Sequence, residues 1–319
     1  MKAVVVNDYG PPEEYTVADL PAPRPGPGQL QVRIAAASIN PGDIVIPGGT
    51  FRDVTPLSFP HVPGNDFAGT VSAVGPGVTG YAVGDEVFGY AAPRALRAML
   101  GPRPSMSTGS LAEYAVVEAD TPFVTHRPAG VPVEQAAALA TAGLTVRALL
   151  ATAGVQPGER VLVVGATGGV GTTLLPLLAA ARATAIATAT PQDADVVRGL
   201  GAAEVIGYGD YPADVDAAFN LTLPSDRLTD VAKAVRPGGR LLTITYPVPQ
   251  QDWIGRADVD LRFVLDMEGR FGGMREVAEL AAGGLLRATI GRRYTLDEGA
   301  QACRDFERRH TTGKLVVVR

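Results

Sequence analysis

Residues 165–171, GATGGVG, have types and a spacing that indicate chemistry. They follow the apolar run VLVV at 161–164 and precede a second apolar stretch, the order expected of a strand, a tight turn and a helix. Three small residues occupy the glycine positions of the G-x-G-x-x-G pattern, which lets the backbone approach a pyrophosphate: Ala166, Gly168 and Gly171. The pattern predicts a dinucleotide site whose phosphates lie against Ala166, Thr167, Gly168, Gly169 and Val170.

The stretch that follows the glycines indicates which dinucleotide is bound. Proteins that bind NAD usually hold the adenosine ribose with an Asp or Glu about 20 residues further on. Thr188, Ala189 and Thr190 stand there instead, so no carboxylate repels a 2′-phosphate. Hydroxyl groups of Thr188, Thr190 and Tyr208 could bind that phosphate. We therefore predict NADPH as the cofactor, although no Lys or Arg immediately follows this strand to pair with the phosphate.

The elements that must position this turn form two contrasting regions. Before about residue 120, short apolar strands are interrupted by Gly and Pro, which predicts an irregular all-β unit; these strands are expected at 2–6, 29–39, 68–75, 85–90 and 112–118. A helix is expected at 133–153, and strands then alternate with helices, which predicts a parallel sheet covered on both faces. The later strands are expected at 161–164, 183–189, 204–208, 216–222, 239–246 and 261–267, followed by a helix at 274–285 and a last strand at 314–319.

Composition excludes several classes of function. A chain of 319 residues suggests two domains at roughly 150 residues each. The net charge of −5 and the pI of about 5.3 offer no basic surface for nucleic acid. The single cysteine, Cys303, allows neither an internal disulfide nor a cluster of zinc-binding thiolates. The N-terminal apolar run is too short for a signal peptide, and the run at 174–181 is too short to span a membrane, so we expect a cytoplasmic protein without a membrane partner.

Several stretches together resemble one family. They are GSLAEYAVV (109–117), AAALATAGLTVRALL (136–150), GERVLVVGATGGVGT (158–172), GLGAAEVIGY (199–208) and the terminal YTLDEGAQA and TTGKLVVVR. Their order and spacing are similar to those of zinc-independent medium-chain dehydrogenase/reductases of the quinone oxidoreductase subgroup, which includes the crystallin-like proteins. The resemblance implies an α/β fold, with a GroES-like β-rich catalytic domain at 1–122 and 271–319 and a doubly wound Rossmann NADP-binding domain at 123–270. It also implies a homodimer.

The same resemblance assigns roles to individual residues. Asn40 and Asp43 of INPGD would lie beside the nicotinamide or the substrate as catalytic residues, and Asn40 would also contact the cofactor. Thr145 of GLTV and Lys314 of TGK would border the cofactor, and Tyr208 would approach the 2′-phosphate. The residue types alone leave other interpretations open. Asn-Pro-Gly-Asp is also an ordinary turn sequence, and Lys314 could be a solvated surface charge.

Two departures from related patterns narrow the chemistry. Zinc-dependent relatives begin the NPGD segment with Cys and place Gly-His-Glu at the next ligand, whereas this chain has Asn40 and Asn65-Asp66. The histidines, at 61, 126 and 310, are too scattered to replace those ligands, so no metal is expected. Related enoyl-thioester reductases place a proton-donating tyrosine eleven residues after the Asn, where this chain has Phe51, which has no proton to give.

These observations favour an NADPH-dependent reductase that transfers a hydride to a quinone or an α,β-unsaturated carbonyl. A quinone needs no tyrosine donor, and for other acceptors the proton would come from water or another residue. The small-molecule substrate would lie between the domains under the 91–109 loop. Two alternatives remain: a pathway-specific enoyl or ketone reductase that tailors a secondary metabolite, and a non-catalytic NADP(H)-binding protein. Cys303 has helix-like spacing and is expected in the core.

Overall fold

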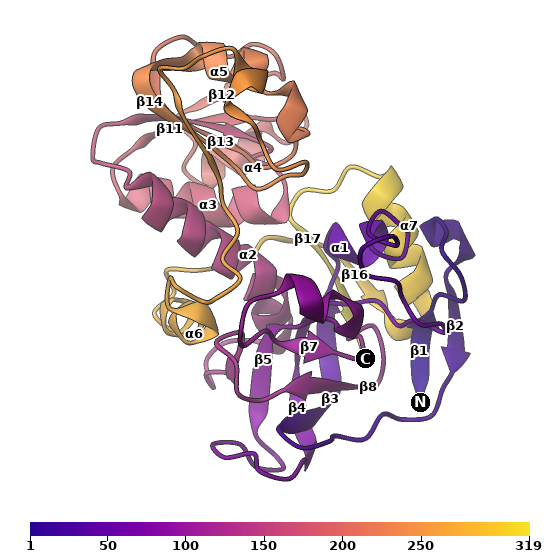
Figure 1. The fold of residues 1–319 in the computed structure, drawn as a ribbon. Helices are drawn as coiled ribbons and strands as arrows, with labels where there is room; N and C mark the ends of the chain where they lie inside the picture. Colours follow the sequence, from indigo (N-terminus) through magenta and orange to yellow (C-terminus); the bar gives the residue numbers. More distant parts are fainter. The chain divides into compact units, whose positions relative to one another are not determined.

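The computed structural model describes residues 1–319, and the chain forms two compact units. Unit 1 consists of Met1–Thr141 and Met267–Arg319, and unit 2 of Ala142–Asp266 (Figure 1). Helix α2, Val133–Ala153, contains the first division between them. The domain boundary expected after residue 122 lies ahead of this helix, whereas the compact units divide within it.

Unit 1 is built on a nine-stranded sheet. Its strands follow the path β6-β7-β8-β3-β4-β5-β9, and β17 joins the sheet by pairing with β3 and β16. The strands are β3 Gln29–Ser38, β4 Asp66–Val74, β5 Glu86–Tyr90, β6 Ala92–Pro93, β7 Met106–Ser107, β8 Tyr114–Glu118, β9 Val124–His126, β16 Ile290–Thr295 and β17 Lys314–Val318. The last strand of the chain therefore returns to the N-terminal region, with Val316 opposite Ser38 in antiparallel register.

Smaller elements complete unit 1. Strands β1 (Lys2–Val5) and β2 (Thr16–Asp19) form a separate two-stranded sheet. The helices are α1 (Gly42–Val45), α6 (Gly273–Ala282) and α7 (Gly299–Arg308). The segment 91–109, expected to be a loop, contains β6, β7 and a short 3₁₀ helix at Arg94–Met99. Its two strands pair in parallel, which a pattern of scattered Gly, Pro and Arg does not reveal.

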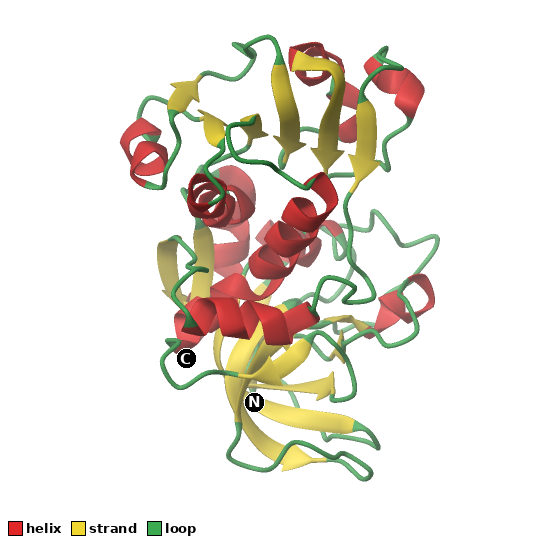
Figure 2. Ribbon diagram, turned by 90° about the vertical axis from the view of Figure 1, so that its left-hand side faces the viewer, coloured by secondary structure: helices red, strands yellow, loops and turns green.

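Unit 2 is a six-stranded parallel sheet with the order β12-β11-β10-β13-β14-β15. Figure 2 shows its strands running in a common direction. This is the 3-2-1-4-5-6 order of the dinucleotide-binding fold, which confirms the expected fold class. The strands are β10 Arg160–Val164, β11 Thr184–Thr188, β12 Glu204–Ile206, β13 Val215–Asn220, β14 Val235–Thr243 and β15 Asp260–Phe263, and the helices after α2 are α3 Gly169–Ala180, α4 Ala194–Gly199 and α5 Thr229–Ala234.

Burial explains why these strands were readable from the sequence. All four valine and leucine residues of 161–164 are 0% exposed, as expected of a central parallel strand covered on both faces. In β3, buried and less buried residues alternate over its first half, which is the period of a strand with one face toward the core.

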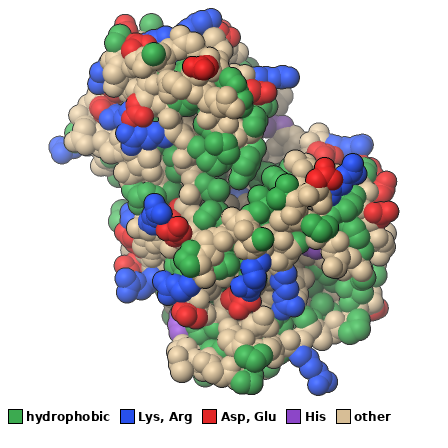
Figure 3. Space-filling model, in the orientation of Figure 1, with side chains coloured by type: hydrophobic (Ala, Val, Ile, Leu, Met, Phe, Trp, Pro, Cys, Tyr) green, Lys and Arg blue, Asp and Glu red, His purple; other side chains and the backbone are tan.

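Charged side chains of both signs are interspersed over the visible surface (Figure 3).

Helix α2 is long and apolar enough to cross a membrane by length and composition alone. Most of its residues are buried within the structure, from Ala136 to Ala153. A buried apolar helix is also what the core of a large domain requires. Its apolar character is therefore accounted for by packing.

Candidate active site

The glycine-rich turn of unit 2 connects β10 to α3. A Cβ built on Gly171 would lie 2.5 Å from the carbonyl oxygen of Ala166, so only glycine lets the helix pack this closely on the turn. Gly168 is the N-cap of α3, no side chain caps the helix, and its first turn has no acidic residue. The amide groups of Gly169 and Val170 are therefore available to bind an anion at the positive end of the helix. These residues fit the diphosphate of a dinucleotide.

The predicted phosphate-binding hydroxyl groups have different surroundings. Thr188 is 0% exposed, and its Oγ1 accepts a hydrogen bond from Gly165 N at 2.9 Å. This side chain therefore stabilises the glycine-rich turn and does not point toward a ligand. Thr190 donates from Oγ1 to Asp193 Oδ2 at 2.7 Å. Tyr208 follows β12 and is half exposed. Only Thr190 and Tyr208 therefore keep a hydroxyl outside the core.

Asp193 is a carboxylate that the sequence analysis missed. Its side chain is 8% exposed and lies five residues beyond the end of β11, where α4 begins. Residues 188–190, at the end of the strand, contain no acid, and Asp193 lies just beyond them. Because Asp193 contacts Thr190, negative charge is present close to the position where the ribose of a dinucleotide is expected.

A buried polar network lies at the carboxyl ends of β13 and β14. Asn220 Nδ2 donates to Leu223 O at 2.7 Å and to Thr243 Oγ1 at 2.9 Å, and its Oδ1 accepts from Leu223 N at 3.0 Å. The loop held in this way contacts the glycine turn, since a Cβ on Gly165 would lie 3.0 Å from Thr222 Cβ. Ligands of parallel sheets bind outside the carboxyl ends of the strands, so this loop forms part of the cofactor site.

Lys314, the first residue of β17, is the centre of a polar cluster inside unit 1. Its Nζ donates to Asn40 Oδ1 at 2.6 Å and to Ile39 O at 3.0 Å, and it lies 3.4 Å from Asp66 Oδ2. The side chains of Lys314 and Asp66 are 7% and 0% exposed. Lys314 is therefore a buried ion-pair partner and not a solvated surface charge.

Asp66 is held by other unit 1 groups in addition to Lys314. Ser38 Oγ donates to its Oδ2 at 2.7 Å, and Thr141 N donates to its Oδ1 at 3.0 Å. A buried ion pair is tolerated when its remaining lone pairs and protons are satisfied in this way. Neither Ser38 nor Asp66 was expected in the site. The sequence signal that could have indicated the buried ion pair is Asp66 itself, a charged residue at the start of the otherwise uncharged strand β4.

The NPGD segment joins the same cluster through Asp43. Its Oδ2 accepts from Asn40 N at 2.8 Å, and its Oδ1 accepts from Gly64 N at 3.1 Å. Gly64 has φ +109, and a Cβ there would lie 2.5 Å from Leu111 N, so only glycine can deliver this amide. The segment is thus a closed turn that leads into α1. Its Asn and Asp side chains are also the ones that the resemblance assigned to the site.

The pKa of Asp43 is raised to about 7, chiefly by burial and also by the charge of nearby Asp66. The amides of Asn40 and Gly64 and the ammonium of Lys314 act in the opposite direction. Burial also raises the pKa of the Cys303 thiol, so this side chain is an unreactive core residue, as expected from its spacing. Asp43 is therefore the group of the cluster that changes its charge near neutral pH.

Asp43 should make stability depend on pH. Its pKa is about 7 in the folded state and near 4 when unfolded, so between these values the folded state holds the additional proton. The free energy of unfolding should then fall as pH rises from about 4 to 7, by up to about 1.4 kcal/mol per pH unit. Asp43→Asn removes this dependence. The check is the difference in unfolding free energy between wild type and variant across that range; a difference independent of pH would contradict the expectation.

A zinc ion does not fit the residues at the positions where zinc-dependent relatives have ligands. Zinc prefers thiolate, imidazole and carboxylate ligands, whereas these positions hold the amides of Asn40 and Asn65. The oxygen of Asn40 is already bound by the ammonium of Lys314. No group of three or more His, Cys, Asp or Glu side chains in the structure could hold a metal ion.

Two family models match the chain. Residues 26–128 match the alcohol dehydrogenase GroES-like domain, and residues 200–317 match the zinc-binding dehydrogenase model. The first match lies within the N-terminal part of unit 1. The second runs from unit 2 into the C-terminal part of unit 1.

Similar proteins extend over nearly the whole chain. The chain is 29% identical to the chloroplastic quinone-oxidoreductase QR1 of Triphysaria versicolor, over 99% of this chain and 98% of that protein. It is also 29% identical to the chloroplastic NADPH-dependent alkenal/one oxidoreductase of Arabidopsis thaliana, over 99% of this chain and 79% of that protein. Among solved structures, the quinone oxidoreductase from Coxiella burnetii is 26% identical with a TM-score of 0.84, covering 100% of this chain and 99% of that one.

Proposed function

The chain belongs to the medium-chain dehydrogenase/reductase family of oxidoreductases, and on this premise we propose that it transfers a hydride from NADPH to a quinone or an α,β-unsaturated carbonyl. The observation that carries the proposal is the glycine turn with the uncapped α3, which offers a dinucleotide its phosphate site. The similar proteins named for quinones and for alkenals and alkenones support the two acceptor classes.

In this proposal the bound nicotinamide supplies the hydride, and the chain supplies binding and orientation. The turn at 165–171 holds the diphosphate, and the Asn220 network holds the loop beside it. In unit 1, Lys314 orients the Asn40 amide, while Asp43 closes the turn and can exchange a proton near neutral pH. We propose Asn40 and Asp43 as the residues that border the reaction, and Thr145, Thr190, Tyr208 and Lys314 as further residues of the cofactor site.

The experiment that tests the function follows the oxidation of NADPH and NADH with a panel of quinones and of cyclic and linear enones. Turnover of a quinone or an enone with NADPH preferred is the expected result. Binding of NADPH without oxidation by any acceptor would favour a non-catalytic binding protein. Turnover of a single elaborate enone or ketone, and of no simple quinone, would favour a dedicated tailoring reductase.

Asp193 should limit the preference for NADPH. Its carboxylate beside Thr190 opposes a 2′-phosphate but not a 2′-hydroxyl group. Replacing it by Asn keeps a hydrogen-bond acceptor for Thr190 and removes the charge. We expect Asp193→Asn to tighten NADPH binding about tenfold, or about 1.4 kcal/mol, and to leave NADH binding unchanged. Titration calorimetry with both cofactors measures this.

Asp195 provides the matched control for that variant. It lies in the first turn of α4, its side chain is 99% exposed, and it pairs with Arg198 at the surface. Asp195→Asn should change neither affinity by more than about twofold, because exposed charges are screened. Equal effects of Asp193→Asn on both cofactors would show that Asp193 does not sense the 2′-phosphate.

We also propose that the protein is a homodimer, as the family resemblance implies. The strands at the two edges of the parallel sheet in unit 2 are β12 and β15. Edge strands carry unpaired backbone groups and can pair with another chain. Sedimentation velocity would give the mass in solution, and a monomer at all concentrations would refute the dimer.

A further inference from the structure

Asn65 is a buried amide without a partner for its oxygen. The side chain is 5% exposed, and its Oδ1 is buried without a hydrogen bond. The backbone, in contrast, is firmly held, since Asn65 O accepts from Ala91 N at 2.8 Å. A buried amide oxygen without a partner is unusual, because buried polar side-chain atoms nearly always find a hydrogen-bond partner.

The side chain of Asn65 belongs to the polar cluster that surrounds Lys314 in unit 1. Asn65 Nδ2 lies 3.1 Å from the position that a Cβ on Gly42 would take, so the side chain packs on the Asn40–Asp43 turn. Its two neighbours in the chain both serve that cluster. Gly64 donates its amide to Asp43, and Asp66 pairs with Lys314. Asn65 thus presents an amide at the turn proposed to border the reaction.

The other polar groups of the cluster are already occupied. Lys314 has three acceptors, namely Ile39 O, Asn40 Oδ1 and Asp66 Oδ2. Asp43 accepts two backbone amides. Ser38 donates to Asp66. In contrast to these groups, the amide oxygen of Asn65 has no hydrogen-bond partner.

We propose that Asn65 binds the oxygen atom of the electron acceptor, as a catalytic residue of the reductase. This inference rests on the proposed function. When a quinone or an enone takes up a hydride at carbon, the electron pair of its C=C–C=O system moves to the oxygen, which then takes a proton from solvent or remains an enolate until carbon is protonated. A hydrogen bond from an amide N–H stabilises that developing negative charge.

An amide suits both oxidation states of a quinone. Nδ2 can donate to a carbonyl oxygen, and a half-turn about χ2 lets Oδ1 accept from the hydroxyl group of the reduced product. A carboxylate could accept but not donate, and an ammonium could donate but not accept. The residue type at position 65 therefore matches a quinone, whose oxygen is a carbonyl before the reaction and a hydroxyl group after it.

The test compares Asn65→Leu with wild type in kinetics and in thermal unfolding. Leu has nearly the same size and no hydrogen-bonding group. We expect kcat/KM for the acceptor to fall about 10²-fold, the effect of losing one oxyanion donor, with the Kd of NADPH unchanged. The melting temperature should stay the same or rise, since a buried polar group without a partner is removed. Unchanged kinetics would overturn the proposal.

Two further variants separate a catalytic role from a structural one. Asn65→Asp keeps the size but replaces the donor by a negative charge, so its kcat/KM should fall at least as far as that of Asn65→Leu. Thr311→Val removes another buried hydroxyl group without a partner, one that packs on Gly291 of β16, and should leave all kinetic constants unchanged. A loss of melting temperature in Asn65→Leu with kinetics like those of Thr311→Val would mean a structural role only.

A binding measurement keeps this test independent of the proposed function. Hydroquinone, with NADP⁺ present, should raise the melting temperature of wild type and not that of Asn65→Leu. If wild type reduces no acceptor in the panel, the proposed function fails, and this shift still tests Asn65 as a ligand for the oxygen. Equal shifts in both proteins, or no shift in either, would overturn the assignment of Asn65.

Discussion

Lys314→Met should lower the free energy of unfolding of unit 1 by about 3–5 kcal/mol, the usual cost of removing one partner from a buried ion pair. The variant leaves Asp66, which is 0% exposed, without the cation that balances its charge. It also takes away the donor that orients the Asn40 amide. Denaturant unfolding followed by far-UV circular dichroism measures the loss.

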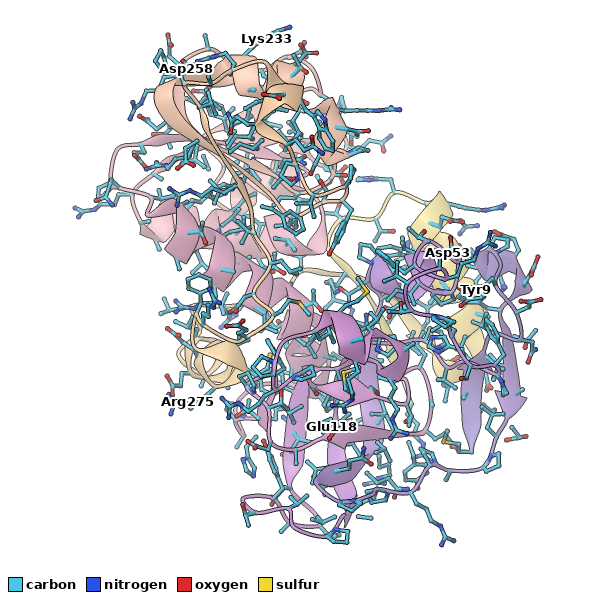
Figure 4. The ribbon with its side chains drawn as sticks, viewed as in Figure 1. Tyr9, Asp53, Glu118, Lys233, Asp258 and Arg275 are labelled. Atoms are coloured by element: carbon cyan, nitrogen blue, oxygen red, sulfur yellow. The ribbon has the colours of Figure 1, made fainter.

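The surface residue Lys233 gives the matched control. It lies on α5 at the surface (Figure 4). Its side chain is 67% exposed and pairs with Asp230. Lys233→Met should change stability by no more than about 0.5 kcal/mol, because exposed ion pairs contribute little. The double variant with Lys314→Met and Asp66→Asn should recover part of the loss, since it leaves no unpaired charge. Equal losses from Lys233→Met and Lys314→Met would contradict the ion-pair argument.

Gly171→Ala should weaken NADPH binding by at least about tenfold and cost about 1–3 kcal/mol of stability, a typical penalty for overpacking. The added Cβ would lie 2.5 Å from Ala166 O, so helix α3 must move away from the turn that holds the diphosphate. The displaced helix carries the amides of Gly169 and Val170 with it. Titration calorimetry gives the affinity, and thermal unfolding gives the change in stability.

Gly199, at the end of α4, is the control for this substitution. A Cβ on Gly199 would meet no atom within 4 Å. Gly199→Ala should therefore be neutral or stabilise by up to about 1 kcal/mol, because alanine loses less backbone entropy on folding. Normal NADPH affinity in Gly171→Ala would show that the close approach of α3 to the turn does not matter for binding.

The fold could be predicted largely because its strands are continuous apolar runs. Helix α2 has the bounds expected from its pattern, and the six strands of the parallel sheet all occur. Helix α7, at Gly299–Arg308, was expected only as helix-like spacing around Cys303, and its bounds were not predicted. Its buried residues are mostly small, among them Gly299, Ala300 and Ala302, and such residues give a weak hydrophobic signal.

The site could be predicted less well, because a linear pattern does not say where a side chain points. Thr188 was placed correctly at the end of its strand, yet its hydroxyl turns inward to Gly165. Lys314 meets Asn40, a partner 274 residues away, which spacing along the chain cannot reveal. Asn65 was given no role in the site from the sequence, and only the three-dimensional contacts show that its oxygen is unpaired.

The discontinuity of unit 1 affects how the protein is made. Unit 2 is one continuous stretch of chain, whereas unit 1 needs both Met1–Thr141 and Met267–Arg319. During synthesis, therefore, β3 lacks its partner β17, and Asp66 lacks Lys314, until all of unit 2 and most of the later segment of unit 1 have been made. A nascent or truncated chain carries an open sheet edge and an uncompensated acid in its core, features that favour aggregation and recognition by chaperones. The polar cluster can thus form only after both segments of unit 1 have been synthesised.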